Sequence, residues 1–141
     1  MKTVRDVMTT HVDCCTTLDN VYEAALKMKE LNVGAIPIIE NDQLVGMVTD
    51  RDLVVRGIAE KHPGSSKITD IMTKDITTVS PSDSVEKALQ VMSEQQIRRL
   101  PVLESGKLVG IVSLGDFSIE EQSDELAGEA LSDISEHDNH H

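Results

Sequence analysis

The sequence predicts a mixed α/β protein made of two copies of one β-α-β-β-α unit. The 141-residue chain matches itself after a shift of 64 positions, as from Asp6 to Asp70. Within each copy, the 3.6-residue periodicity of a helix alternates with short β-prone runs. Two of these runs in each copy are apolar on both faces, which is typical of a sheet covered by helices.

The internal repeat continues without a gap along most of the chain. The matching segments are Asp6-Val7-Met8-Thr9 with Asp70-Ile71-Met72-Thr73, Val21 with Val85, Ala24 with Ala88, Met28 with Met92, Pro37 with Pro101, Leu44-Val45-Gly46 with Leu108-Val109-Gly110, and Asp52 with Asp116. We therefore expect a first repeat at 1–58, a linker at 59–65, a second repeat at 66–120 and an acidic C-terminal tail at 121–141. At this length, the two copies are expected to share one hydrophobic core.

The first repeat predicts five elements. They are a β-prone piece at 12–17, an amphipathic helix containing Val21, Ala24, Ala25, Met28 and Leu31, strands at Ala35–Glu40 and Gln43–Val48, and a second helix that begins near Asp50 to Asp52 and carries Leu53, Val54, Val55 and Ile58. The helical spacing of the apolar residues supports the first helix. Asn41-Asp42 is a turn signal between the two strands, so this pair is expected to form a hairpin.

The second repeat predicts the same order of elements. They are a β-prone piece at 76–80, a helix containing Val85, Ala88, Leu89 and Met92, and strands at Leu100–Glu104 and Lys107–Val112 joined by Ser105-Gly106. Pro81-Ser82-Asp83-Ser84 marks the start of the helix, because such residues accept hydrogen bonds from the free amides there. After Asp116 the helical pattern is poorer. In the tail, Leu126, Ala130, Leu131 and Ile134 have loosely helical spacing.

Composition limits the classes of function. A net charge of −12 disfavours binding to nucleic acid or to an anionic membrane. No apolar run approaches the roughly 20 residues that span a bilayer, and the N-terminus has no signal-peptide pattern, so a cytoplasmic protein is expected. The adjacent Cys14 and Cys15 are expected to be reduced and structural. His11 and His62 lack metal-ligand spacing, so no metal is expected.

One short motif occurs twice and carries the candidate chemistry. It runs from Gly46 to Asp52 and from Gly110 to Asp116, with a hydroxyl residue three positions before the aspartate. Three-residue spacing places both side chains on one face of a helical turn. The hydroxyl with nearby amides can hold a phosphate, and the carboxylate can accept hydrogen bonds from sugar hydroxyls. Thr49 and Ser113 can equally be N-caps, and the aspartates can simply favour the helix dipole.

These motifs together resemble a pair of CBS domains, also called a Bateman module. The resemblance rests on the two Asp-hydrophobic-Met-Thr segments, on Ile36-Pro37-Ile38 and Leu100-Pro101-Val102, and on the two Gly-x-x-Thr/Ser-x-x-Asp motifs, and it covers about residues 3–120. It implies tandem repeats related by a pseudo-twofold axis, with sheets packed face to face and flanking helices. It also implies a cleft for up to two adenosyl ligands, such as AMP, ADP, ATP or S-adenosylmethionine, and a homodimer that regulates a partner protein without catalysis.

The resemblance implies two ligand sites. The first would consist of Thr49, Asp50, Arg51, Asp52, Ile76, Thr77, Arg98, Arg99 and Leu100, and the second of Ser113, Asp116, Val12, Asp13, Gly34, Ala35 and Ile36. In the first site, Arg98 and Arg99 would neutralise a phosphate. We therefore expect the first site to bind a phosphorylated nucleotide better. The second is expected to be empty, weak, or selective for a less anionic adenosyl ligand.

The sequence fits three classes of function to different degrees. The leading one is a regulatory module in which an adenosyl ligand shifts the population of conformations that a partner recognises. The alternative is a structural dimerisation or protein-interaction module whose cleft is vestigial; the presence of Thr49, Asp52 and Arg98-Arg99 argues against it. An enzyme is the least favoured, because the sequence has no Ser-His-Asp or Cys-His arrangement, no Walker-type glycine loop and no metal cluster.

Overall fold

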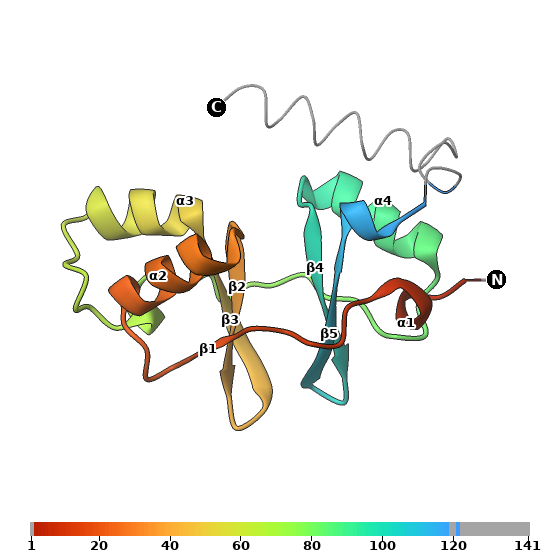
Figure 1. Cartoon of the computed structure of the whole chain (residues 1–141), viewed down its shortest axis with the longest axis horizontal. Coiled ribbons are helices and arrows are strands. Elements are labelled where there is room, and N and C mark those ends of the chain that lie inside the picture. The colour runs from red at the N-terminus through yellow and green to blue at the C-terminus, as the bar shows by residue number, and fades with distance from the viewer. Residues whose placement is uncertain (1, 119–120, 122–141) are drawn as a thin grey trace. The chain divides into compact units, whose positions relative to one another are not determined.

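The computed structural model describes residues 2–118 and residue 121 (Figure 1). The mixed α/β class is confirmed, with helices and strands alternating along the chain. The chain forms two compact units. Unit I consists of the described residues of Met1–Val12, Thr77–Ser105 and Val109–His141, and unit II consists of Asp13–Ile76 and Gly106–Leu108. The predicted helical spacing at Leu126, Ala130, Leu131 and Ile134 lies outside the described residues.

Unit II contains the elements of the first repeat from residue 13 onward, together with one turn from the start of the second repeat. They are β1 (Cys15–Thr16), α2 (Val21–Leu31), β2 (Ala35–Glu40), β3 (Gln43–Thr49), α3 (Asp50–Asp52), the π-helical η1 (Leu53–Ile58) and the 3₁₀ turn η2 (Ile68–Asp70). Strand β2 pairs in parallel with β1 and antiparallel with β3. Asn41 and Asp42 both have positive φ, at 52° and 65°, as the predicted tight hairpin requires. The β-prone piece at 12–17 contributes only the two-residue strand β1.

Unit I contains the elements of the second repeat from residue 77 onward, except for the start of one strand at 107–108, together with a short helix from the start of the first repeat. They are α1 (Val4–Val7), α4 (Val85–Gln95), β4 (Arg99–Glu104), β5 (Lys107–Ser113) and the 3₁₀ turn η3 (Leu114–Asp116). Strands β4 and β5 are hydrogen-bonded neighbours. The β-prone piece at 76–80 is not a full strand, because it makes one isolated parallel bridge between Val79 and Val102. Both predicted hairpins are therefore confirmed to within one residue at their ends.

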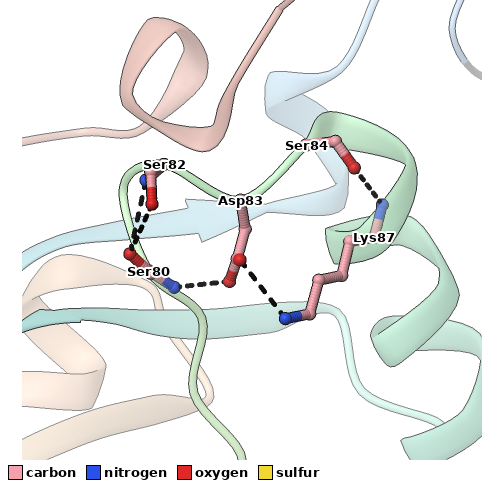
Figure 2. A network of polar contacts seen from close by, with 5 residues as sticks. All are labelled: Ser80, Ser82, Asp83, Ser84 and Lys87. Carbon is pink, nitrogen blue, oxygen red and sulfur yellow. Dashed lines mark hydrogen bonds and ion pairs between the residues drawn. The ribbon is translucent and has the colours of Figure 1, made fainter.

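The start of α4 confirms the predicted cap (Figure 2). The Ser84 hydroxyl accepts a hydrogen bond from the Lys87 amide at 3.1 Å, so Ser84 is the N-cap. Asp83 Oδ2 accepts from the Ser80 amide at 2.7 Å, and its Oδ1 lies 3.2 Å from Lys87 Nζ. The Ser84 bond satisfies one of the amides that the first turn of a helix leaves free, and the Asp83 bonds fix the turn before it. Asn20 caps α2 in the same way, accepting from Glu23 N–H at 2.8 Å.

The buried apolar residues form two clusters, one in each unit. Unit I buries Val4 with α4 and its two strands, whereas unit II buries Ile68, Ile71 and Met72 with α2 and its strands. Each unit therefore has its own cluster of buried residues, and the single core shared by both copies stays a prediction. The segment that begins each sequence repeat supplies apolar side chains to the unit formed by the other repeat. Consequently the compact units do not follow the repeat boundaries 1–58 and 66–120.

Candidate ligand-binding site

In each unit, a Met-Thr segment from one repeat crosses the glycine motif of the other. In unit II, the Met47 amide donates to the Thr73 carbonyl at 2.9 Å, and the Thr73 amide donates to the Met47 carbonyl at 2.7 Å. Thr9 and Ile111 exchange the same two bonds in unit I, at 2.8 and 2.9 Å. Both motifs are thereby fixed by backbone hydrogen bonds. Both segments are visible in the sequence as repeats, but their pairing is not.

Thr49 and Asp52 form a closed capping arrangement in unit II. Thr49 Oγ1 accepts from the Asp52 amide at 3.0 Å, and Asp52 Oδ2 accepts from the Thr49 amide at 3.0 Å. Only 9% of Asp52 is exposed. Thr73 Oγ1 also donates to the carboxylate, lying 3.2 Å from Oδ1 and 3.1 Å from Oδ2. The N-cap interpretation of Thr49 is therefore confirmed, and the Asp52 carboxylate is already hydrogen-bonded by the protein.

Ser113 and Asp116 form the corresponding motif in unit I, but it is open to solvent. The Ser113 amide donates to Asp116 Oδ2 at 2.8 Å. Asp116 is exposed and Ser113 is half-buried. Among the described residues of this unit, no side-chain hydroxyl donates to Asp116. This carboxylate therefore keeps oxygen lone pairs that a sugar hydroxyl can use.

The start of β4 lies beside the Ser113 motif. The Leu114 amide donates to the Arg98 carbonyl at 2.8 Å, so Arg98 and Arg99 are next to Ser113 in unit I. Leu100 is fully buried and anchors this end of the strand, whereas Arg98 is exposed. Arg99 is half-buried, and its Nε is buried without a hydrogen-bond partner within the part of the chain that the structure describes. Val12 and Thr77 also belong to unit I.

The start of β2 lies beside Thr49 in the same manner. Ala35 pairs with Thr49 across the two strands, and the Asp50 amide donates to the Gly34 carbonyl at 2.9 Å. Ile36 is buried, whereas Arg51 is exposed. Ile76, also expected at a site, belongs to unit II and is half-buried. Here Gly34 and Ala35 replace the arginine pair of unit I.

The structure thus groups each motif with the strand start of its own repeat. Arg98 and Arg99 accompany Ser113 and Asp116, which the sequence analysis did not expect. The predicted first site instead combines Thr49 and Asp52 of unit II with Arg98 and Arg99 of unit I. That combination joins two units and stays a prediction, as does the second site that joins Ser113 and Asp116 with Asp13, Ala35 and Ile36.

Within residues 2–118 and 121, the structure shows neither a metal-binding cluster nor an activated thiol. No three His, Cys, Asp or Glu side chains there are grouped as a metal site. Burial raises the pKa of the Cys14 thiol and raises that of Cys15 to about 11. Both thiols are therefore protonated at neutral pH, and neither is an activated nucleophile. Nor is any helix in this part of the chain long and apolar enough to cross a membrane.

Comparisons with known proteins agree on one family. The sequence model of the CBS domain matches residues 4–57 and 68–120. The Bacillus subtilis (strain 168) protein YlbB, described as uncharacterised, is 57% identical over 141 residues, covering 99% of this chain and 95% of that protein. The crystal structure of Hypoxic Response Protein I with two coordinated zinc ions is 38% identical, with a TM-score of 0.75 over 82% of this chain and 96% of that one.

A further solved structure contains adenosyl ligands. The CBS domain pair of protein MJ0100, in complex with 5′-methylthioadenosine and S-adenosyl-L-methionine, has a TM-score of 0.72 and 25% identity, covering 82% of this chain and 92% of that one. Fold and sequence thus agree over both repeats.

Proposed function

Since the chain belongs to the CBS domain family and contains two such domains, we propose that it is a regulatory module that binds an adenosine-type ligand. One observation carries this proposal: the Leu114–Arg98 hydrogen bond groups Ser113 and Asp116 with two arginines in unit I. The exposed Asp116 carboxylate accepts from ribose hydroxyls, and the guanidinium groups pair with an anionic group on the same ligand.

Arg98 and Arg99 supply the local positive charge that an acidic protein needs in order to bind an anion. A protein with a net charge of −12 repels phosphate unless cations are concentrated locally. Arg98 and Arg99 are such a concentration, and the Nε of Arg99 is a buried donor with no hydrogen-bond partner among the described residues. We propose that they act with Asp116, rather than mainly with Asp52 as the sequence suggested. The second candidate site lies in unit II, is less basic, and consists of Thr49, Asp50, Arg51 and Asp52.

The ligand class is supported by the relative that binds S-adenosylmethionine and 5′-methylthioadenosine. AMP, ADP, ATP and S-adenosylmethionine all combine a ribose diol with a charged group at the 5′ side. The proposed mechanism is a population shift: bound ligand stabilises one conformation, and an unidentified partner protein recognises it. None of these steps needs a chemical reaction at the ligand.

A homodimer is part of the proposal. Large apolar side chains of unit II are exposed on two adjacent helical elements, α2 and η1; they include Tyr22, Leu26, Val54, Val55 and Ile58. An isologous contact between two copies would cover the same face on each. We therefore propose that a second copy of this chain docks there.

Thermal unfolding with added nucleotide tests the function. A ligand that binds only the native state at 100 times its Kd adds about 2.7 kcal/mol to the free energy of unfolding. We expect the midpoint to rise with at least one of AMP, ADP, ATP and S-adenosylmethionine, and not with inorganic phosphate alone at the same concentration. No rise with any adenosyl compound, together with a persistent dimer, would instead favour the structural module with a vestigial cleft.

A further inference from the structure

Asp52 and Asp116 occupy equivalent positions in the sequence repeat but unequal positions in the structure. Asp52 is 9% exposed, whereas Asp116 is exposed. Each accepts a hydrogen bond from the amide of its own hydroxyl residue, Thr49 or Ser113. The difference is a third residue, Thr73, whose hydroxyl lies 3.1 and 3.2 Å from the two Asp52 oxygens.

The backbone of Thr73 is held in place by hydrogen bonds that do not involve its side chain. Its amide and carbonyl both pair with Met47. The preceding carbonyl, that of Met72, accepts from Arg56 Nη1 at 3.0 Å. The hydroxyl is therefore presented to Asp52 by a fixed backbone, and turning it away requires only a change of its χ1 rotamer.

The repeat supplies a matched position in Thr9. Its backbone makes the same pair of hydrogen bonds, to Ile111. Within the described residues of unit I, however, the Thr9 hydroxyl donates no hydrogen bond to Asp116. Thr73 and Thr9 therefore make the same backbone pairing, but of the two only Thr73 donates its hydroxyl to the aspartate of its unit.

A ribose diol needs an accessible carboxylate with free lone pairs. At Asp52 both oxygens lie within 3.2 Å of Thr73 Oγ1, Oδ2 also accepts from the Thr49 amide, and only 9% of the residue is exposed, so a ribose hydroxyl reaches this carboxylate only when the Thr73 side chain moves. We propose that Thr73 acts as a latch that withholds Asp52 from ligand, so that the chain binds one adenosyl ligand through Asp116. This inference rests on the proposed function and deepens it. The latch makes Asp52 a link between the two sequence repeats, because Thr73 belongs to the second and Asp52 to the first.

A double-mutant cycle tests the latch without ligand. Thr73→Val removes the donor and keeps the shape of the side chain, and Asp52→Asn removes the charge. Because the two residues share one interaction, the double variant should lose less thermal stability than the sum of the two single variants. The matched cycle of Thr9→Val with Asp116→Asn should be additive. Additive losses at Thr73 and Asp52 would overturn the latch.

Calorimetric titration with AMP and with S-adenosylmethionine tests the withholding. We expect one equivalent bound per wild-type chain, and a second equivalent in Thr73→Ala, which removes both the donor and the side-chain bulk beside Asp52. The second equivalent should disappear again in the Thr73→Ala/Asp52→Asn double variant, and Thr9→Ala should still bind one. Circular dichroism and a cooperative unfolding transition establish that each variant is folded.

The outcomes separate the latch from the proposed function. Two equivalents bound by the wild-type chain, which needs no variant, would overturn the latch and leave the ligand function standing. So would a folded Thr73→Ala variant that binds only one. No binding of either compound by the wild type and all variants would overturn the ligand function and, with it, the role of Thr73 in withholding.

Discussion

Gly46 lies directly against Met72 in unit II. A Cβ atom at Gly46 would be 2.5 Å from Met72 Sδ and 3.1 Å from the Thr73 carbonyl oxygen. The thioether can rotate away, but the carbonyl cannot, because it accepts from the Met47 amide at 2.9 Å. Gly110 repeats this arrangement against Met8 and the Thr9 carbonyl, at 2.7 and 3.0 Å. The glycine of each motif is therefore required by the crossing backbone.

We predict that Gly46→Ala and Gly110→Ala each destabilise the protein by about 1–3 kcal/mol, which is the usual cost of an overpacked site. Gly115→Ala is the matched control, because no atom lies within 4 Å of its added Cβ. Urea unfolding measures the three variants side by side. A loss at Gly115 as large as at Gly46 would contradict the crossing-backbone explanation.

The sequence predicts local elements well here because their determinants are local. Turn residues such as Asn41-Asp42 and a cap such as Ser84 act over three or four positions, so they are visible in the chain. Because the chain matches itself after 64 residues, each element could be predicted twice, once from each copy. These two sources explain why the strands β2 to β5 were predicted with nearly correct ends, and why α2 and α4 contain the residues expected of them.

The exchange of segments between repeats was not predicted, because it depends on contacts distant in sequence. Nothing near Thr73 indicates that its hydroxyl reaches Asp52, 21 positions away. The same holds for Arg98, whose carbonyl meets Leu114 through the pairing of β4 and β5. The sequence shows both partners, since each repeat contains one Met-Thr pair and one motif glycine, but it does not show that each glycine meets the Met-Thr pair of the other repeat.

The arginine pair gives a prediction about charge. Arg98→Gln and Arg99→Gln should each weaken AMP binding about 10- to 100-fold, the range expected for a lost charge-assisted hydrogen bond, and should change adenosine binding far less. Arg5→Gln is the control, because Arg5 is an exposed arginine of unit I that forms an ion pair with Glu104 at 3.7 Å. Fluorescence or calorimetric titration with both compounds makes the comparison.

The same variants show whether the arginines act with Asp116 or with Asp52. If they act with Asp116 on one ligand, the effects of Arg99→Gln and Asp116→Asn on AMP affinity should be strongly non-additive. The effects of Arg99→Gln and Asp52→Asn should then be independent. The reverse pattern would support the site that the sequence predicted across Asp52 and Arg99.

The exposed apolar face gives a prediction about assembly. Ile58 is 74% exposed and Val54 is 57% exposed on η1. Ile58→Glu should convert the proposed dimer into a monomer, because a charge buried without a partner is costly. Thr10→Glu adds the same charge at an exposed position in unit I and should leave the dimer intact. Light scattering during size-exclusion chromatography measures both masses; an Ile58→Glu dimer would exclude this face as the contact.

The buried cysteine gives a prediction about pH. Burial raises the pKa of Cys15 from the ordinary 9.0 to about 11, so the folded state keeps this proton more strongly than the unfolded chain does. Stability is therefore unaffected below pH 9 and should fall as the pH rises from 9 through 11, by at most about 2–3 kcal/mol from this group. The loss should be smaller in Cys15→Ala, although that variant is less stable throughout because of its cavity.

Alkylation reports the same pKa at the level of the residue. Iodoacetamide attacks the thiolate, so native Cys15 should stay unmodified at pH 7.5, and half-buried Cys14 should react slowly and faster as the pH rises. Chain unfolded in urea is the control, in which both thiols should react at ordinary rates. Peptide mass spectrometry distinguishes the two positions by their fragments. Rapid labelling of Cys15 in the native protein at pH 7.5 would show that α2 and β1 open far more readily than the buried packing of this residue implies.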